Sequence, residues 1–198
     1  MSANFLFNAA WLILWDRELI HAASGCLWAM TICSLAAASF NYLRVYKQGF
    51  DLNLYKPSEL WLNRLLVQNG LEVYVTWTLI ASFVNSVVAV QYPPQGYTAA
   101  DPKMAALIAL AVLAGLFVLW FPFEISVFDK YCRYAVTQYA VIPFAMGGIY
   151  ARKDTINIPE IEYLVLAFGI AGLAMLLIKL FLLVYRSKHN PLFPPIRG

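Results

Sequence analysis

Long apolar segments alternate with short polar breaks along this chain, and the alternation predicts an all-α polytopic transmembrane helical bundle. The apolar segments lie at about 3–15, 19–43, 68–91, 103–123, 134–151 and 160–185. A helix needs about 20 predominantly apolar residues to cross the ~30 Å hydrocarbon core of a bilayer. We therefore expect one transmembrane domain, residues 1–198, with five or six crossings.

The first segment is too short for a full crossing. Its core, FLFNAAWLILW, would span only about 20 Å as a helix, so we expect a partial crossing. No Lys or Arg precedes it, and it ends in Trp15-Asp16-Arg17-Glu18 without a small-residue cleavage site. We therefore expect it to be retained rather than removed as a signal peptide.

The other segments differ in how cleanly they are bounded. Segment 19–43 is rich in Ala, Ser, Gly and Thr, which allow close helix approach in lipid. Residues 58–67 are expected to lie along the interface or to begin the next helix. Pro122 is expected to end or kink its helix, and Pro143 with Gly147-Gly148 to bend segment 134–151.

The composition supports a lipid environment. Hydrophobic residues make up 62% of the 198 residues and charged residues 13%, with a mean hydropathy of +0.65. Soluble domains carry about 25% charged residues. The net charge is +3, but the bases are scattered at the ends of apolar segments. The sequence therefore excludes the basic patch that nucleic-acid binding requires.

The distribution of Lys and Arg predicts the orientation. Alternate ends of six crossings separate nine bases from four, apart from Lys179, which falls inside a segment. The nine are Arg44, Lys47, Lys56, Arg64, Lys130, Arg133, Arg186, Lys188 and Arg197, and the four are Arg17, Lys103, Arg152 and Lys153. The positive-inside rule then places both termini in the cytoplasm.

Segment 68–91 carries polar and aromatic residues at helical spacing. Asn85 falls at midhelix, where an amide without a partner costs several kcal/mol in hydrocarbon, so it is expected to face the bundle interior. Tyr74, Trp77, Ala81 and Asn85 recur at intervals of three, four and four residues and are expected to share that face. Glu72, in the first turn, is expected to reach interfacial water.

The first segment repeats part of this pattern. Asn8 and Trp11 have the Asn-x-x-Trp spacing on one helix face. Aromatic stripes are commonly core, but indoles stack on flat apolar molecules and amides orient them. The predicted ligand-binding residues are Tyr74, Trp77, Asn85, Asn8 and Trp11.

The remaining ionisable residues and the cysteines indicate no metal, cofactor or catalytic site. Lys179 is expected to extend to the interface, and Glu124 to pair with Lys130 or Arg133. Two distant histidines and no CxxC pair predict no metal site and no cofactor. No nucleophile with a His partner, Gly-rich phosphate loop or carboxylate pair is present, so we expect no catalytic residue.

Three stretches of the chain resemble helices of the translocator protein/tryptophan-rich sensory protein (TspO/MBR) family, in its multi-pass eukaryotic relatives. FNAAWLILWDRE is similar to the end of the family's third helix. YVTWTLIASFVN resembles the fifth, in a Tyr-x-x-Trp-x-x-x-Ala-x-x-x-Asn pattern, and FDKYCRYAVTQYAVIPFAMGG is similar to the helices that follow. The family's Pro-Trp-rich opening pair of helices has no counterpart, so a truncated form lacking two upstream helices is expected. The resemblance implies a helical bundle with a pocket for hydrophobic, often planar ligands such as porphyrins or sterols.

Three classes of function remain open on the sequence. The first is non-enzymatic binding or transport of a small hydrophobic ligand in an intrabundle cavity. The second is a structural or assembly subunit, or a homo-oligomer, whose polar stripes are helix–helix contacts. The third is a channel or transporter, suggested by the broken segment around Pro143. In each class the lipid bilayer is the principal partner.

Overall fold

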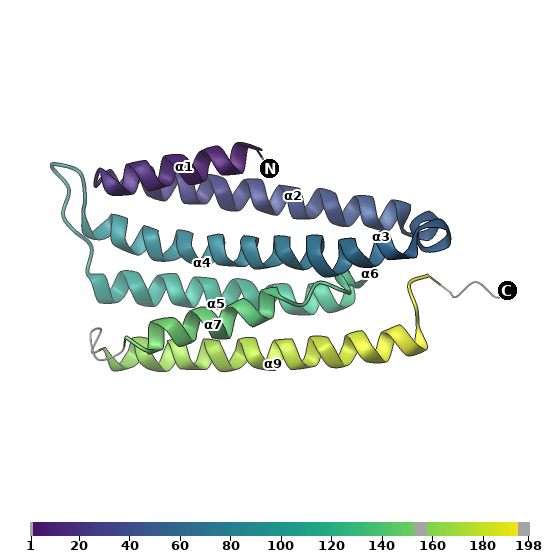
Figure 1. Ribbon diagram of the computed structural model, residues 1–198. Coiled ribbons are helices and arrows are strands. Elements are labelled where there is room, and N and C mark those ends of the chain that lie inside the picture. The colour runs from purple at the N-terminus through teal and green to yellow at the C-terminus, as the bar shows by residue number, and fades with distance from the viewer. Residues whose placement is uncertain (1, 153–157, 194–198) are drawn as a thin grey trace.

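The computed structural model describes residues 2–152 and 158–193, and throughout these ranges the regular structure is helical (Figure 1). The helices are α1 (Ser2–Asp16), α2 (Ile20–Tyr55), α3 (Pro57–Leu62), the π-helical turn η1 (Asn63–Gln68), α4 (Asn69–Gln91), α5 (Pro102–Ser126), α6 (Asp129–Cys132), α7 (Gln138–Tyr150) and α9 (Pro159–His189). The all-α prediction is confirmed for these residues.

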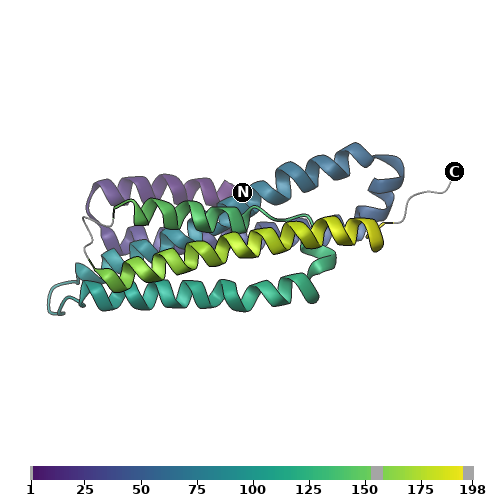
Figure 2. The ribbon, with the colours of Figure 1, turned by 90° about the horizontal axis from the view of Figure 1, so that it is seen from below.

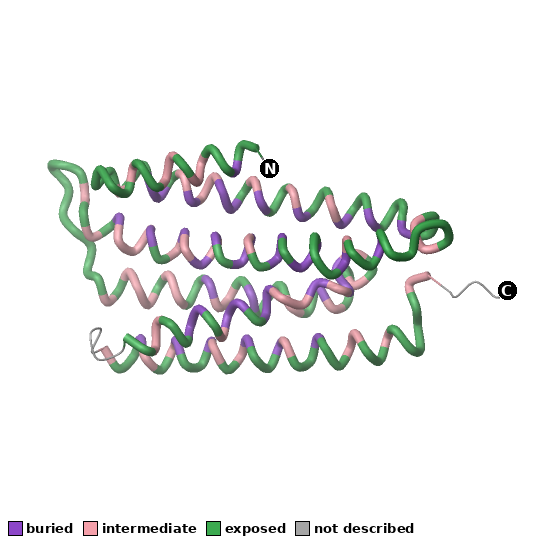
Figure 3. The backbone as a smooth tube through the Cα atoms, viewed as in Figure 1, coloured by how far each residue is buried: buried purple, intermediate pink, exposed green. Residues whose placement is uncertain are grey.

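Four helical stretches of the described chain are long and apolar enough to cross a membrane. They are Ile20–Tyr55, Pro57–Gln91, Pro102–Ser126 and Pro159–His189. Many large apolar side chains on them are exposed, and Figure 3 shows the exposed residues on the outer sides of the bundle. An outer surface of this kind is stable in hydrocarbon but not in water.

Prolines and one polar cap set several helix boundaries. α2 continues well beyond the predicted residue 43 and ends only before Lys56-Pro57, because the polar residues after Arg44 do not break a helix. Pro102 and Pro159 occupy first helical positions, and the Asp101 carboxylate accepts a hydrogen bond from the Lys103 amide at 3.1 Å.

Pro122 does not end its helix, which was one of the two outcomes expected for it. α5 runs on to Ser126. A transmembrane helix tolerates an internal proline because neighbouring helices and side chains can satisfy the backbone groups that the proline leaves unpaired. Residues 58–67 begin the next helical stretch, the second of the two alternatives expected for them. α3 and η1 lead into α4 without a non-helical break, so Glu72 stands well inside a helical stretch that begins at Pro57.

α4 lies in the middle of the bundle and packs against α2, α5 and α7, while α9 packs against α5 and α7 (Figures 1 and 2). α1 lies beside α2 and begins partway along it. At 15 residues it is shorter than the candidate spans. The partial crossing expected from the sequence stays a prediction.

Hydroxyl groups join the N-terminal part of α2 to the C-terminal part of α4. The hydroxyl oxygens of Thr31 and Ser82 are hydrogen-bonded at 3.0 Å, and the Trp28 indole donates to the Ser86 hydroxyl at 3.0 Å. Ser82 is completely buried. Small hydroxyl residues let two backbones approach while each hydroxyl stays hydrogen-bonded, which is how polar side chains are accommodated between membrane helices.

A non-helical stretch, residues 133–137, lies between α6 and α7, and Asn69 satisfies its backbone. The Asn69 amide nitrogen donates to the carbonyls of Arg64 (2.8 Å) and Tyr134 (2.9 Å). Its amide oxygen accepts from the amides of Val136 (3.0 Å) and Thr137 (3.2 Å), and the Thr137 hydroxyl donates to the Asn69 carbonyl (2.7 Å). Backbone outside a helix is stable within a membrane protein only when its polar groups are paired in this way.

We expect Asn69→Ala to lower the free energy of unfolding by about 2–4 kcal/mol, because it leaves several buried backbone groups unpaired. Denaturant unfolding in mixed micelles, followed by circular dichroism, measures this change. Asn41→Ala is the matched control, since the amide oxygen of Asn41 is buried without a partner. Equal losses in both variants would contradict the assigned role of Asn69.

Candidate functional site

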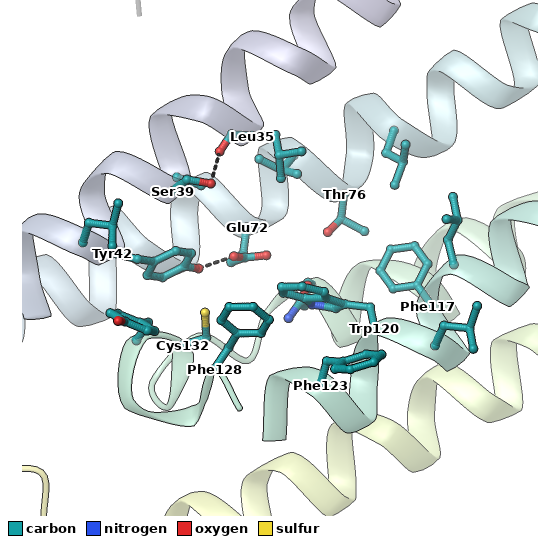
Figure 4. A pocket seen from close by; sticks show the side chains of 18 residues that line it. Leu35, Ser39, Tyr42, Glu72, Thr76, Phe117, Trp120, Phe123, Phe128 and Cys132 are labelled. Atoms are coloured by element: carbon teal, nitrogen blue, oxygen red, sulfur yellow. Dashed lines mark hydrogen bonds between the residues drawn. The ribbon is translucent and has the colours of Figure 1, made fainter. Parts of the chain in front are cut away.

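A cavity of about 790 Å³ lies between α2, α4, α5 and α6 (Figure 4). Its walls are mainly aliphatic and aromatic, and its polar groups come from a few side chains. The 18 lining residues are Leu35, Ala38, Ser39, Tyr42, Leu43, Glu72, Val75, Thr76, Leu79, Leu116, Phe117, Leu119, Trp120, Phe123, Phe128, Tyr131, Cys132 and Gln138. A concave apolar space with a few convergent polar groups is the usual form of a small-molecule site.

The cavity opens toward the side of the bundle. Leu35 on α2 and Leu116, Leu119 and Phe123 on α5 line it and are also exposed on the outer surface. These residues are carried by two of the candidate membrane spans.

Glu72 is the lining residue with a carboxylate, and its side chain is buried rather than at the interface as predicted. Glu72 is only 8% exposed. The hydroxyl of Tyr42 on α2 donates to one of its carboxylate oxygens (Figure 4). The prediction was wrong because α4 continues the helical stretch from Pro57, so Glu72 is not in the first turn after a water interface.

A second buried carboxylate lies behind the cavity wall. Glu124 on α5 is 0% exposed and pairs with the Lys179 ammonium on α9 at 2.5 Å. Gln138 donates to Glu124 at 2.6 Å, and Tyr139 also donates to it. Lys179 donates further to the Cys132 carbonyl at 3.1 Å. Because Gln138 and Cys132 line the cavity, this network fixes the positions of two lining residues.

This arrangement overturns two predictions. Lys179 does not extend to the interface, being 2% exposed, because Glu124 offers it a counter-charge inside the bundle. Glu124 does not pair with Lys130 or Arg133. Arg133 instead contacts Asp129 at 2.5 Å, in a cluster that Arg186 joins at 2.7 Å.

The predicted ligand-binding residues do not line this cavity. Tyr74 is half-buried and its hydroxyl donates to Asn4 on α1 at 2.9 Å, one turn before Asn8, which is also half-buried. The Trp11 indole nitrogen is buried without a hydrogen-bond partner. Binding by these residues is not tested by the structure and stays a prediction.

The expected shared face of α4 is only partly correct. Asn85 is buried at 6% exposure, and its amide oxygen has no partner in the described chain. Trp77, however, is 49% exposed, and its ring lies 6.3 Å from that of Phe144, itself exposed. At about 100° per residue, Trp77 is rotated roughly 80° from Asn85, enough to carry it past the edge of the buried face.

Sequence reasoning missed the cavity because it assigned one buried face to each helix. α4 is in the centre and is covered on several sides, so Glu72 is buried although it lies on the opposite side of the helix from Asn85. A carboxylate inside an apolar segment was the available signal, since such residues usually mark function.

The described residues contain no group of three or more His, Cys, Asp or Glu side chains that could hold a metal ion. The cysteines at positions 26, 33 and 132 are free.

Comparison with known proteins adds a family to this geometry. The family model described as TSPO-like protein matches residues 1–182. The chain belongs to the TSPO-like protein family. No curated protein and no solved structure matches it. The resemblance to the TspO family is thus confirmed at the level of the family, and the TSPO-like chain is a multi-pass membrane protein.

The family match starts at residue 1 of the TSPO-like chain. It gives no support for the expectation that two opening helices are missing, nor for a eukaryotic origin.

We expect Asn85→Leu to leave the free energy of unfolding unchanged or to raise it by about 1 kcal/mol when the protein is monomeric in detergent micelles. An apolar side chain of similar shape removes a buried amide oxygen that has no partner. Ser82→Ala is the comparison, because it removes the hydrogen bond to Thr31 and is expected to be destabilising. A loss of more than 1 kcal/mol for Asn85→Leu would show that Asn85 is paired within the monomer.

Proposed function

We propose that this TSPO-like protein binds or carries a small hydrophobic ligand, porphyrin- or sterol-like, in the cavity between α2, α4, α5 and α6, without catalysing a reaction on it. The observation that carries the proposal is the cavity itself, about 790 Å³ with aromatic and aliphatic walls. This volume falls within the roughly 300–1,000 Å³ range of small-molecule sites. The lateral opening supports uptake from the bilayer.

The proposed topology has five crossings. α5 and α9 run in the same direction along the bundle (Figure 1), so the chain between them returns through α6, residues 133–137 and α7. The full crossings are then α2, α4, α5, the segment ending in α7, and α9, with α1 crossing partway. We further propose that the bundle end with more bases, which carries the C-terminal end of α9, is cytoplasmic. A full crossing by α1 would add a sixth and would place the N-terminus on the same side.

A role as an assembly subunit or homo-oligomer is the second candidate. Its support is the pair of exposed aromatic rings of Trp77 on α4 and Phe144 on α7, whose centroids lie 6.3 Å apart. A helix of a second protein could cover these rings. In this role Trp77→Ala dissociates the complex, and light scattering in detergent then reports a smaller particle.

Filling the cavity tests the ligand-binding proposal. Ser39 lines it and Ala36, on the same helix, does not, and both are exposed. We expect Ser39→Phe to weaken binding of the fluorescent sterol dehydroergosterol by about tenfold, a loss of ~1.4 kcal/mol, because its ring occupies ligand space. Ala36→Phe is expected to have no effect.

The measurement is energy transfer from the protein's tryptophans to the sterol in phosphatidylcholine nanodiscs, with protoporphyrin quenching as a second probe. Saturable signals that Ser39→Phe weakens support the cavity. Signals that rise linearly with probe, or that both variants weaken equally, would contradict it.

A further inference from the structure

We propose that the cavity selects ligands whose apolar body carries a protonated amine, and that Glu72 is the residue that pairs with the amine. This inference rests on the proposed function, because it assigns a chemical class to the ligand of that same cavity. It concerns the one carboxylate among the lining residues, which among the described residues has Tyr42 as its hydrogen-bond partner.

The hydrogen bonds of Glu72 are incomplete. Tyr42 donates to Oε1, and no other hydrogen bond or ion pair to the carboxylate is formed by the described residues. A carboxylate accepts up to about four hydrogen bonds. Oε2 therefore retains its full capacity to accept from a molecule in the cavity.

The buried cation whose charge acts on Glu72, Lys179, already has a partner. Lys179 lies 2.5 Å from Glu124 and also donates to the Cys132 carbonyl, and no hydrogen bond or ion pair joins it to Glu72 among the described residues. Glu124 and Lys179 neutralise each other, so Glu72, when ionised, has no counter-charge of its own. Burying an unmatched charge is costly, and a cationic ligand removes that cost when it binds.

The walls near Glu72 suit the rest of such a ligand. Trp120, Phe128 and Phe117 line the same space, and Figure 4 shows Glu72 projecting from α4 toward it. Aromatic faces attract an ammonium group when it is desolvated and also pack against an apolar body. The other polar lining side chains, such as Thr76 and Gln138, carry no charge.

A neutral ligand would use Glu72 less well. A hydroxyl group can donate one hydrogen bond to Oε2 but leaves the negative charge in place. An ammonium donates and also neutralises, and charge-assisted hydrogen bonds are roughly twice as strong as neutral ones. The structure therefore favours an amine over an alcohol on the same apolar body.

Two sterols that differ in one group provide the test. The probes are cholesterol and 3β-aminocholest-5-ene, a primary amine that is protonated at pH 7 because alkylamines have pKa values near 10. Each competes with dehydroergosterol for the protein in nanodiscs of zwitterionic phosphatidylcholine. We expect the wild-type chain to bind the amine about tenfold more tightly than the alcohol.

Glu72→Gln keeps an acceptor for Tyr42 but removes the charge, and is expected to reduce the amine preference below threefold while cholesterol binding stays within twofold. Glu72→Asp retains the carboxylate and is expected to restore most of the preference. Glu162→Gln is the matched control, because it removes the same charge from α9 outside the cavity.

The outcomes separate the two proposals. Loss of the amine preference in Glu72→Gln alone supports the pairing. Equal binding of the two sterols by the wild-type chain, with Ser39→Phe still weakening both, would overturn the pairing and leave the cavity intact. Equal loss of preference in Glu72→Gln and Glu162→Gln would also overturn it, as a surface-charge effect. Absence of saturable binding by either sterol would overturn both proposals.

Discussion

The ammonium of Lys179 lies 2.5 Å from the carboxylate of Glu124, and both side chains are sealed inside the bundle. Hydrocarbon offers no hydrogen bonds and little stabilisation of charge, so each group requires the other within the protein. The pair joins α5 to α9, and Tyr139 donates from α7 to the same carboxylate. Three helices that are distant in sequence therefore meet at one ionic contact.

The same requirement shapes the cavity. The stretch 133–137 leaves the helical form, and Asn69 on α4 satisfies its backbone, which places Cys132 and Gln138 against the cavity. Hydroxyl contacts hold α2 against α4, and Tyr42 orients Glu72. These contacts pair the polar groups that fix the walls, while the Glu72 carboxylate remains incompletely paired and faces the cavity. The proposed site therefore lies at the polar group that the protein leaves incompletely hydrogen-bonded, and not at the cluster that contains the most polar groups.

The positions of the long helices could be predicted from the sequence because each helix coincides with an apolar segment bounded by polar residues. The contacts between helices could not be predicted, although a partial signal existed for the contact between Glu124 and Lys179. Glu124 and Lys179 each lie far along helices that run in the same direction, so alternating topology alone places them at similar depth. Glu72 and Trp77 were misplaced for a different reason. Helical spacing gives angles on one helix, but not how many neighbours cover it, and the central α4 is covered on several sides.

A double-mutant cycle between Glu124 and Lys179 tests this account most directly. Glu124→Gln, Lys179→Met and the double variant are unfolded reversibly in mixed micelles, alongside the same substitutions in the exposed pair Glu160 and Lys103. The account predicts a coupling energy of about 2 kcal/mol or more for the buried pair and below about 1 kcal/mol for the exposed pair. Additive effects at Glu124 and Lys179 would contradict it, because the two charges would then not depend on each other inside the bundle.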